Sequence, residues 1–388
     1  MKLIFVCDGF YPDEHAAAIR HTTLARGLVE NGHSVDFLLI NPQHWINKKS
    51  LMQDGISYTE LNSYRGTNEL LRRSHFTRSI HKAKRIIGKR AEQKDLDAVV
   101  VLTLEPLSIK ILINTARKLG VKVFHERTEL PYALPKTTEK QELLLNTYYK
   151  LLPGFDGIFV ITDKLGKFIQ QFNKNTPKLV TVVDVPAFNS NPPRPYPFPY
   201  IGYCGTTIDS VKDGVPILIE AFSKITTRFP DLKLVLMGNT TYKAVIQDTV
   251  DAVAHFKLSD KIIFTGPIGR KMMPSMLCNA EILVVSKPDN EQNSGNFPIK
   301  IGEYLAAGVP VVVTSVGEIP QFIKDGESGF LAVPGSADSF AQKMEEALSN
   351  KERAITIGQK GREVAEENFD YKKVAKTMAD YIRDAGST

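Results

Sequence analysis

The sequence predicts an α/β protein built from two doubly wound domains that face each other across a cleft. Short apolar runs rich in β-branched residues alternate with amphipathic stretches along the chain, as in parallel sheets covered by helices on both faces. The chain has 388 residues, which fits two domains better than one. Six prolines between Pro186 and Pro199 mark a seam between two series of apolar runs.

The expected strands follow from the apolar runs, taken in order. In the first half they are Lys2–Cys7, Ser34–Ile40, Ala98–Thr103, Lys122–Glu126, Gly157–Thr162 and Leu179–Val183. In the second half they are Tyr200–Gly205, Lys233–Gly238, Ile262–Gly266, Ile282–Ser286, Val309–Thr314 and Gly329–Val333. Several end in glycine or a small polar residue, which is typical of turns at a binding edge. Ligands bind outside the carboxyl ends of such sheets, so we expect both carboxyl edges to border the cleft.

The domain boundaries follow the same pattern. Residues 1–185 are expected to form the first Rossmann-like domain and residues 200–368 the second. The segment 186–199 is interpreted as an extended linker, because its prolines exclude an inner strand. Residues 369–388 are expected to form a helix that packs back on the first domain.

Composition excludes several classes of protein. Its 43% hydrophobic and 24% charged residues are ordinary globular values and exclude a disordered or collagen-like chain. The cysteines Cys7, Cys204 and Cys278 lie far apart, which argues against a disulfide framework or a zinc knuckle. No apolar run is long enough for a signal peptide or a membrane span, so we expect a cytoplasmic protein.

The positive charge is concentrated in one window. The formal net charge is +6, but ten basic and two acidic residues between Arg65 and Lys94 give that window +8. One basic patch on a nearly neutral body argues against nucleic acid and for one acidic partner. From Arg72 to Arg90 the window is amphipathic, so it is interpreted either as a solvated basic helix face or as a site for docking peripherally on the anionic inner face of a membrane.

The strongest local motif is the run from Ser294 to Pro310, which follows a predicted strand and a polar loop. Its polar residues and Pro298 suit the start of a helix. Lys300 and Glu303 share one helix face near the positive end, where an ammonium group favours a diphosphate and a carboxylate can bind a ribose diol. A solvated Lys–Glu pair on an ordinary helix is the alternative.

Two weaker motifs follow other predicted strands. A glycine, two hydroxyls and a lysine in the segment 205–214 can approach phosphate oxygens, although the P-loop spacing is absent and a plain turn is the alternative. His125, Glu126 and Glu129 can orient or deprotonate a hydroxyl, unless the histidine is structural. Asp95-Leu96-Asp97 matches a metal-binding pattern but precedes its strand, so polar capping residues are expected there.

Together these motifs resemble the retaining glycosyltransferases of family 4, which have the two-domain GT-B fold. The resemblance spans nearly the whole chain. Its most specific part is the block Pro298-Ile299-Lys300, Glu303-Tyr304 and Ala307-Gly308-Val309-Pro310. Further matching motifs are Gly32-His33-Ser34-Val35, His125-Glu126, Lys212-Asp213-Gly214 and Gly317-Glu318-Ile319-Pro320.

The resemblance implies a nucleotide-diphosphate sugar on the C-terminal domain and an acceptor on the N-terminal domain. Lys212 would hold the diphosphate and Glu303 the ribose, while His125, with Glu126 beside it, would be catalytic and contact the donor sugar. The expected donor-binding residues are Gly205, Thr206, Thr207, Lys212, Gly266, Pro267, Ile268, Gly295, Asn296, Phe297, Pro298, Lys300 and Glu303. The family uses neither a metal ion nor a separate cofactor, so none is expected here.

Three positions depart from the family pattern. Gly295 stands where the family has the first of two glutamates, and Thr206 stands where it has a phosphate-binding arginine. Ala16-Ala17 replaces a Gly-Gly pair in the first loop. Backbone amides at Gly295 and Asn296 would then contact the sugar, and Lys300 would help to hold the diphosphate.

The expected function is transfer of a hexose from a nucleotide-diphosphate sugar to an acceptor hydroxyl, with retention at the anomeric carbon. The acceptor would be a glycan or a lipid-linked compound in surface polysaccharide or lipid-linked glycan assembly. A sugar-nucleotide 2-epimerase on the same fold and a non-catalytic nucleotide-sugar-binding protein are the alternatives.

Overall fold

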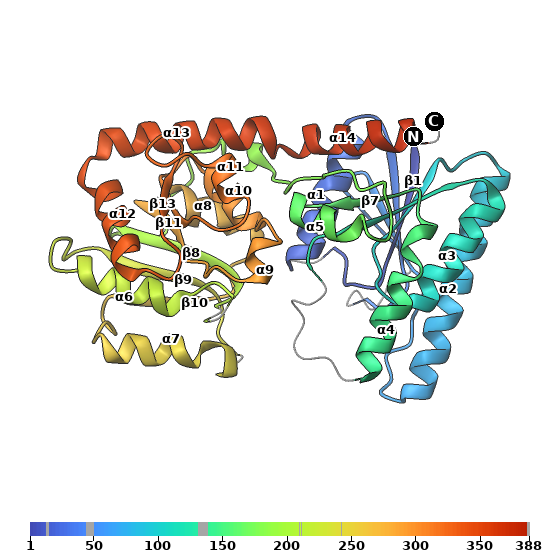
Figure 1. Ribbon diagram of the computed structural model, residues 1–388, viewed down its shortest axis with the longest axis horizontal. Coiled ribbons are helices and arrows are strands. Elements are labelled where there is room, and N and C mark those ends of the chain that lie inside the picture. The colour runs from blue at the N-terminus through green and yellow to red at the C-terminus, as the bar shows by residue number, and fades with distance from the viewer. Residues whose placement is uncertain are drawn as a thin grey trace. The chain divides into compact units, whose positions relative to one another are not determined.

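The computed structural model describes residues 1–12, 15–43, 50–130, 139–208, 210, 212–241 and 243–385. The chain divides into two compact units. Unit 1 comprises Met1–Val180 and Tyr371–Thr388, and unit 2 comprises Thr181–Asp370. Each unit contains its own parallel sheet with helices packed on it, as Figure 1 shows.

The sheet of unit 1 has the strand order β3-β4-β2-β1-β5-β6-β7. Its strands are β1 (Lys2–Cys7), β2 (Ser34–Leu39), β3 (Ser50–Gln53), β4 (Ile56–Glu60), β5 (Ala98–Val101), β6 (Lys122–Arg127) and β7 (Gly157–Val160). All pairings are parallel except that of β3 with β4. The strand order reverses between β1 and β5, so the topological switch point of unit 1 lies there.

The helices of unit 1 cover this sheet. They are α1 (Ala16–Glu30), α2 (Glu69–Glu92), α3 (Pro106–Leu119), α4 (Glu139–Tyr149), the 3-10 turn Leu152–Gly154, α5 (Asp163–Ile169) and α14 (Tyr371–Asp384). The last helix, α14, packs on α1 of the same unit, where the Tyr371 hydroxyl donates to Glu30 at 2.7 Å. The C-terminal segment is therefore part of unit 1.

The sheet of unit 2 has the order β10-β9-β8-β11-β12-β13, with all pairings parallel. Its strands are β8 (Tyr200–Thr207), β9 (Lys233–Asn239), β10 (Ile262–Gly266), β11 (Ile282–Val285), β12 (Val311–Thr314) and β13 (Phe330–Ala332). Here the order reverses between β8 and β11. The carboxyl ends of these two strands therefore form the switch point of unit 2, where doubly wound sheets bind ligands.

Unit 2 contains short helices beside its switch point and longer ones around its core. The helical segments are Val185–Phe188 (3-10), α6 (Val215–Ile225), α7 (Lys243–His255), Arg270–Met272 (3-10), α8 (Met273–Cys278), α9 (Glu291–Ser294), α10 (Ile299–Ala306), α11 (Ile319–Phe322), α12 (Ala337–Ser349) and α13 (Lys351–Asn368). Helices α6 and α12 pack together, with Phe222 and Phe340 fully buried in the core.

The structure differs from the sequence expectations in four places. Residues 179–183 form no strand, and within this range only Val183 makes an isolated bridge, with Asp370. The hairpin β3–β4 was not expected. The proline-rich segment is hydrogen-bonded to α8, because Ser275 donates to the carbonyl of Pro193 at 2.6 Å and Asn279 to that of Pro192 at 3.2 Å. The division between the units falls at Val180 and Thr181 instead.

Two helix-interior glycines of unit 1 allow a test of the packing of α14. A Cβ atom on Gly27 would lie 2.4 Å from the Tyr371 carbonyl oxygen and 2.8 Å from the Ala375 Cβ, whereas nothing lies within 4 Å of one on Gly88. We expect Gly27→Ala to destabilise unit 1 by about 1–3 kcal/mol through overpacking. Gly88→Ala should instead be neutral or stabilising by up to about 1 kcal/mol. Urea-unfolding midpoints measure both, and equal effects would contradict the proposed close packing of α1 and α14.

Candidate functional site

A buried carboxylate lies at the switch point of unit 2. Asp213, in the loop between β8 and α6, accepts hydrogen bonds from the Lys287 ammonium at 2.9 Å, from the Tyr203 hydroxyl at 2.6 Å and from the Lys300 ammonium. Asp213 is 4% exposed. Burial alone would raise the pKa of Asp213, but Lys300 and Lys287 together hold that pKa well below its usual range. Asp213 is therefore an ionised centre that two lysines share.

Lys287 follows β11, from which Ser286 separates it, and is 1% exposed. Besides Asp213, its ammonium donates to the Asn293 side-chain oxygen at 2.9 Å and to the Lys212 carbonyl at 3.5 Å. The Asn293 amide also donates to the Lys212 carbonyl, at 3.0 Å. Burial lowers the pKa of Lys287, and Asp213 opposes that shift. These bonds join the loop after β8 to the loop after β11.

Lys300, in the first turn of α10, reaches the end of β8. A Cβ atom on Gly205 would lie 3.4 Å from the Lys300 Nζ and 2.8 Å from the Tyr203 Oη, so only glycine leaves space at this position. The Lys300 ammonium lies 4.9 Å from the centre of the Tyr203 ring. Its side chain is 17% exposed. Lys300 thus combines a buried anchor on Asp213 with a partly open ammonium group.

Glu303, one turn further along α10, pairs with an arginine that the sequence analysis did not consider. Arg270 donates from Nη1 to the Glu303 Oε1 at 2.6 Å. Burial raises the pKa of the nearby Cys204 thiol to about 12, and Glu303, Lys300 and Arg270 all act on it. Charged groups of both signs therefore act on Cys204 of β8.

The other residues of the segment 205–214 have mixed exposure. Thr206 is exposed and Thr207 is half-buried at the end of β8. Lys212 is half-buried, and its carbonyl oxygen accepts the bonds from Lys287 and Asn293 described above. Asp209 and Val211 of this motif lie outside the described residues.

Two further predicted donor segments follow β10 and α9. Gly266 has a φ of +73°, which favours glycine, and is followed by an exposed Pro267 and a half-buried Ile268. Gly295, the C-cap of α9, is buried. Asn296 is 9% exposed, and its side-chain oxygen has no hydrogen-bond partner among the described residues. This oxygen is the kind of buried group that a ligand donor can satisfy.

The start of α10 differs from its expected form. The helix begins at Ile299 with Pro298 as its N-cap, and no side chain caps it. Phe297 was expected to bind the donor, but the residue is 3% exposed and its side chain packs in the core. Its ring centre lies 5.2 Å from those of Phe322 and Phe369. Phe297 therefore stabilises unit 2 and presents no ring to a ligand.

The expected catalytic role of His125 is also corrected by its environment. The side chain is fully buried in unit 1, with Nδ1 2.6 Å from the Val101 carbonyl oxygen and Nε2 2.9 Å from the Tyr148 hydroxyl. The Phe155 ring stacks on the imidazole at 4.9 Å. Burial lowers the pKa of His125 to about 3, so the ring is neutral. Both nitrogens are occupied within the unit, which is the structural alternative for this histidine.

Glu126 is buried as well, in a cluster with two residues of α1. Its Oε1 accepts from the Arg20 guanidinium at 2.9 and 3.1 Å, and its Oε2 lies 2.7 Å from the His21 Nε2. Burial would raise the pKa of Glu126, but Arg20 and His21 hold it at about 2. The His21 Nδ1 lies 2.6 Å from the Tyr11 hydroxyl. In this structure Glu126 anchors α1 to β6 rather than facing a ligand.

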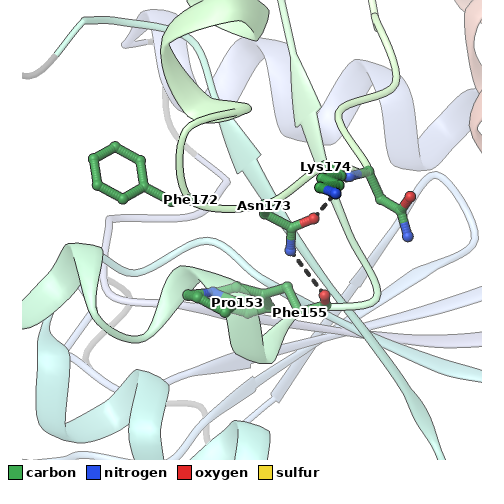
Figure 2. A pocket seen from close by; sticks show the side chains of 6 residues that line it. Pro153, Phe155, Phe172, Asn173 and Lys174 are labelled. Carbon is green, nitrogen blue, oxygen red and sulfur yellow. Dashed lines mark hydrogen bonds between the residues drawn. The ribbon is translucent and has the colours of Figure 1, made fainter.

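A shallow pocket of about 270 Å³ lies beside this region of unit 1, and Figure 2 shows its lining. The Asn173 amide at its centre donates to the Phe155 carbonyl at 2.9 Å. None of the predicted site residues lines this pocket. It is therefore not part of the predicted site.

The switch point of unit 1 also holds a carboxylate that the sequence analysis did not select. Asp8 follows β1, and its Oδ2 accepts from the Thr103 hydroxyl at 2.5 Å. Burial raises the pKa of Asp8. The Asp95-Leu96-Asp97 pattern lies at the opposite edge, where Asp97 accepts from the Lys2 backbone amide at 2.6 Å. As expected, Asp97 serves there as a local hydrogen-bonding residue.

Sequence reasoning missed Asp213, Lys287, Asn293 and Arg270. Lys287 had a usable signal, because a lysine directly after a buried strand lies at the carboxyl edge of the sheet. Asp213 was within a matched motif but was given no role. Arg270 had no local signal, since only the tertiary structure brings the 3-10 turn that follows β10 to Glu303.

Comparison with known proteins adds a family match for unit 2. Residues 198–350 match the family model described as glycosyl transferases group 1. A GDP-mannose-dependent alpha-(1-6)-phosphatidylinositol monomannoside mannosyltransferase of Mycobacterium tuberculosis is 26% identical over 177 residues, 44% of each chain. An N-acetyl-alpha-D-glucosaminyl L-malate synthase of Bacillus anthracis is 27% identical over 171 residues, 43% of this chain and 42% of its own. The matches thus span less than half the length of these relatives.

Solved structures resemble the whole chain. Sucrose-phosphate synthase of Thermosynechococcus elongatus gives a TM-score of 0.74 at 18% identity and covers 100% of this chain and 99% of its own. HepE of Anabaena, in complex with UDP and glucose, gives 0.74 at 15% identity and covers 99% of this chain and 100% of its own. With two parallel-sheet Rossmann-like units, the chain has the GT-B fold.

The buried cluster around Glu126 predicts acid sensitivity of unit 1. The ordinary pKa of Glu126 is 4.5 and its folded value is about 2, so its contribution to stability is present above pH 4.5 and is lost as the pH falls toward 2. Glu126→Gln should cost roughly 3–5 kcal/mol at neutral pH, because it leaves Arg20 buried without its counter-ion. It should also flatten the decline in stability below pH 4.5. Urea unfolding between pH 7 and pH 3 measures both effects, and an unchanged acid profile in the variant would contradict this role.

Proposed function

We propose that the chain is a glycosyltransferase that moves a hexose from a nucleotide-diphosphate sugar to an acceptor hydroxyl. The donor would bind at the switch point of unit 2, and unit 1 would supply the acceptor site. The acceptor would be a glycan or a lipid-linked compound in surface polysaccharide or lipid-linked glycan assembly. Transfer would retain the configuration at the anomeric carbon and would need no metal ion.

One observation carries this proposal: cationic side chains and a buried carboxylate meet at the switch point of unit 2. Lys300 and Lys287 share Asp213, and Glu303 lies one turn beyond Lys300 on α10. Two relatives match this half of the chain. One is named as a GDP-mannose-dependent mannosyltransferase and the other as an N-acetyl-alpha-D-glucosaminyl L-malate synthase. Both kinds of support point to a nucleotide sugar on unit 2.

The proposed contacts follow the chemistry of the donor. Lys300 and Lys212 would hold the diphosphate, since ammonium groups stabilise the charge that develops on a leaving phosphate. The Glu303 Oε1 accepts from the Arg270 Nη1 at 2.6 Å, and the second carboxylate oxygen, Oε2, would accept from the ribose diol. Gly266, Pro267 and Ile268 would flank the base.

The proposed transfer takes place on one face of the sugar. The bond between the anomeric carbon and the diphosphate oxygen breaks, and the acceptor oxygen bonds to the same carbon. The acceptor's proton passes to the departing phosphate. This route requires cations around the diphosphate, which unit 2 offers, and no protein base, which agrees with the burial of His125.

Substitutions at the proposed donor site test the function. We expect Glu303→Ala to reduce transfer by about 100-fold, through loss of charged hydrogen bonds to the ribose. Lys212→Ala should cause a loss of similar size through the diphosphate. Release of nucleoside diphosphate from UDP-glucose, UDP-N-acetylglucosamine and GDP-mannose, with an acceptor panel, measures both.

Glu291→Ala is the matched control, because this glutamate is exposed on α9 beside the site. It should retain full turnover and an unchanged melting temperature. Full turnover in the Glu303 or Lys212 variants would remove those residues from the site. Conversion of the donor to its epimer without transfer would replace the proposed reaction with epimerisation.

We also propose that α2 docks the protein on the anionic inner face of a membrane. The stripe Ile80, Ala83 and Ile87 is buried in unit 1, as the spacing predicted, and Phe76 is half-buried beside it. The opposite face is exposed and basic, with Arg78, Lys82, Arg85 and Lys89, and the exposed Lys84 flanks the buried stripe. Leu70 and Leu71 at the start of α2 are 77% and 49% exposed. Basic residues with nearby exposed leucines suit a lipid surface.

No helix in the described part of the chain is both long and apolar enough to span a bilayer.

Vesicle sedimentation tests the docking of α2. Replacing Arg78, Lys84, Arg85 and Lys89 by glutamine should weaken binding to vesicles with anionic lipid by about tenfold or more, since each near-surface charge contributes about 1 kcal/mol. The matched control removes four exposed lysines elsewhere, namely Lys110, Lys118, Lys351 and Lys360. Equal sedimentation with neutral and anionic vesicles, or equal loss in both variants, would reject the docking of α2.

A further inference from the structure

Two lysines meet Asp213, but they differ in what they offer to a ligand. Lys287 is 1% exposed, and three acceptor oxygens surround its ammonium: those of Asp213, Asn293 and the Lys212 carbonyl. An ammonium has three N–H donors, so Lys287 has none left for a ligand. Because all three N–H donors are used, the side chain of Lys287 must be protonated.

Lys300 has the opposite character. Its side chain is 17% exposed, and Asp213 is the hydrogen-bond acceptor that it uses within the described residues. Its Nζ would lie 3.4 Å from a Cβ atom on Gly205, near the end of β8. Lys300 therefore keeps donors that can turn to an anion at the switch point.

The charges of this cluster do not balance. Asp213 contributes one negative charge, while Lys287 and Lys300 contribute two positive charges, and the Tyr203 hydroxyl that also bonds to Asp213 is neutral. If Lys287 did not hold the other oxygen of Asp213, the carboxylate would cancel the charge of Lys300. With Lys287 in place, one positive charge remains, and it lies in surroundings of low polarity where charge acts over longer distances.

We infer that Lys287 is a positioning residue that sets the affinity of this site for a diphosphate without touching it. It neutralises Asp213, so that the charge of Lys300 is left for the ligand, and it fixes the Lys212 backbone through the same ammonium group. The inference rests on the proposed function, because it assumes that a nucleoside diphosphate binds at the unit 2 switch point. It adds to that function a residue that determines how strongly the site distinguishes ligands by their charge.

Calorimetric titration of Lys287→Met with UDP, GDP and ADP, and with the matching monophosphates and nucleosides, tests this role. The diphosphate that binds the wild-type protein should bind the variant about tenfold more weakly, the monophosphate should lose less, and the nucleoside should be unaffected. A merely structural role would instead weaken all three ligands by the same factor. That outcome would overturn the inference.

The double variant Asp213→Asn with Lys287→Met provides a charge rescue. It restores the net charge of +1, because both removed charges cancel, so the diphosphate should bind within about threefold of the wild-type affinity. A double variant as weak as Lys287→Met would overturn the inference, since lost packing rather than lost charge would then explain the effect. Lys287→Gln removes the same charge and replaces Lys287→Met if that variant has a lowered melting temperature.

Lys224→Met is the matched control. It removes one lysine from the last turn of α6, the helix whose first turn follows Gly214, and Lys224 pairs with Asp338 and Glu220 away from Asp213. Its diphosphate affinity should equal that of the wild-type protein. If no diphosphate binds the wild-type protein, the proposed function fails. If a diphosphate binds and Lys287→Met binds it equally well, only the inference fails.

Discussion

One carboxylate, that of Asp213, organises the polar edge of unit 2. It lies 4% exposed at the switch point, where burial of a charge is costly unless the charge is paired. Lys287 after β11 and Lys300 on α10 supply two ammonium groups, and Tyr203 on β8 supplies a hydroxyl. Two regions that are far apart in the sequence, one with Tyr203 and Asp213 and one with Lys287 and Lys300, are thus held together by one ionised group. The arrangement retains more positive than negative charge, which is the property that an anionic ligand requires.

Unit 1 also contains a buried, ionised carboxylate, but its charge has different partners. Glu126 is buried and ionised between Arg20 and His21, so α1 is fixed to the end of β6. Removing one member of such a cluster costs far more than the cluster contributes relative to apolar packing. The neighbouring His125 is neutral and fully bonded. The two units therefore share a fold but differ at their carboxyl edges. Unit 2 keeps the partly exposed ammonium of Lys300 there, whereas unit 1 buries His125 and Glu126 in its packing.

Most strands were predictable because a buried parallel strand needs an uninterrupted apolar run. Runs such as Lys2–Cys7 and Ile262–Gly266 match their strands residue for residue. The hairpin β3–β4 was missed because its residues are mainly exposed or half-buried and show no apolar run. Residues 179–183 have the composition of a strand, but this part of the chain pairs only at the isolated bridges of Lys178 with Val160 and of Val183 with Asp370. Phe297 looked like part of a binding motif, yet its ring packs on Phe322 and Phe369.

The sequence by itself determined the two doubly wound units, the positions of most of their strands along the chain and the nomination of Lys300 and Glu303, because apolar periodicity and position after a strand are local properties. Tertiary structure alone decided which partner each charged group has. It paired Glu303 with Arg270, joined Lys287 to Asp213 and buried His125 with the Phe155 ring stacked on it. The reason is physical: the burial and pairing of a charge depend on groups from distant strands that meet only when the sheet is formed.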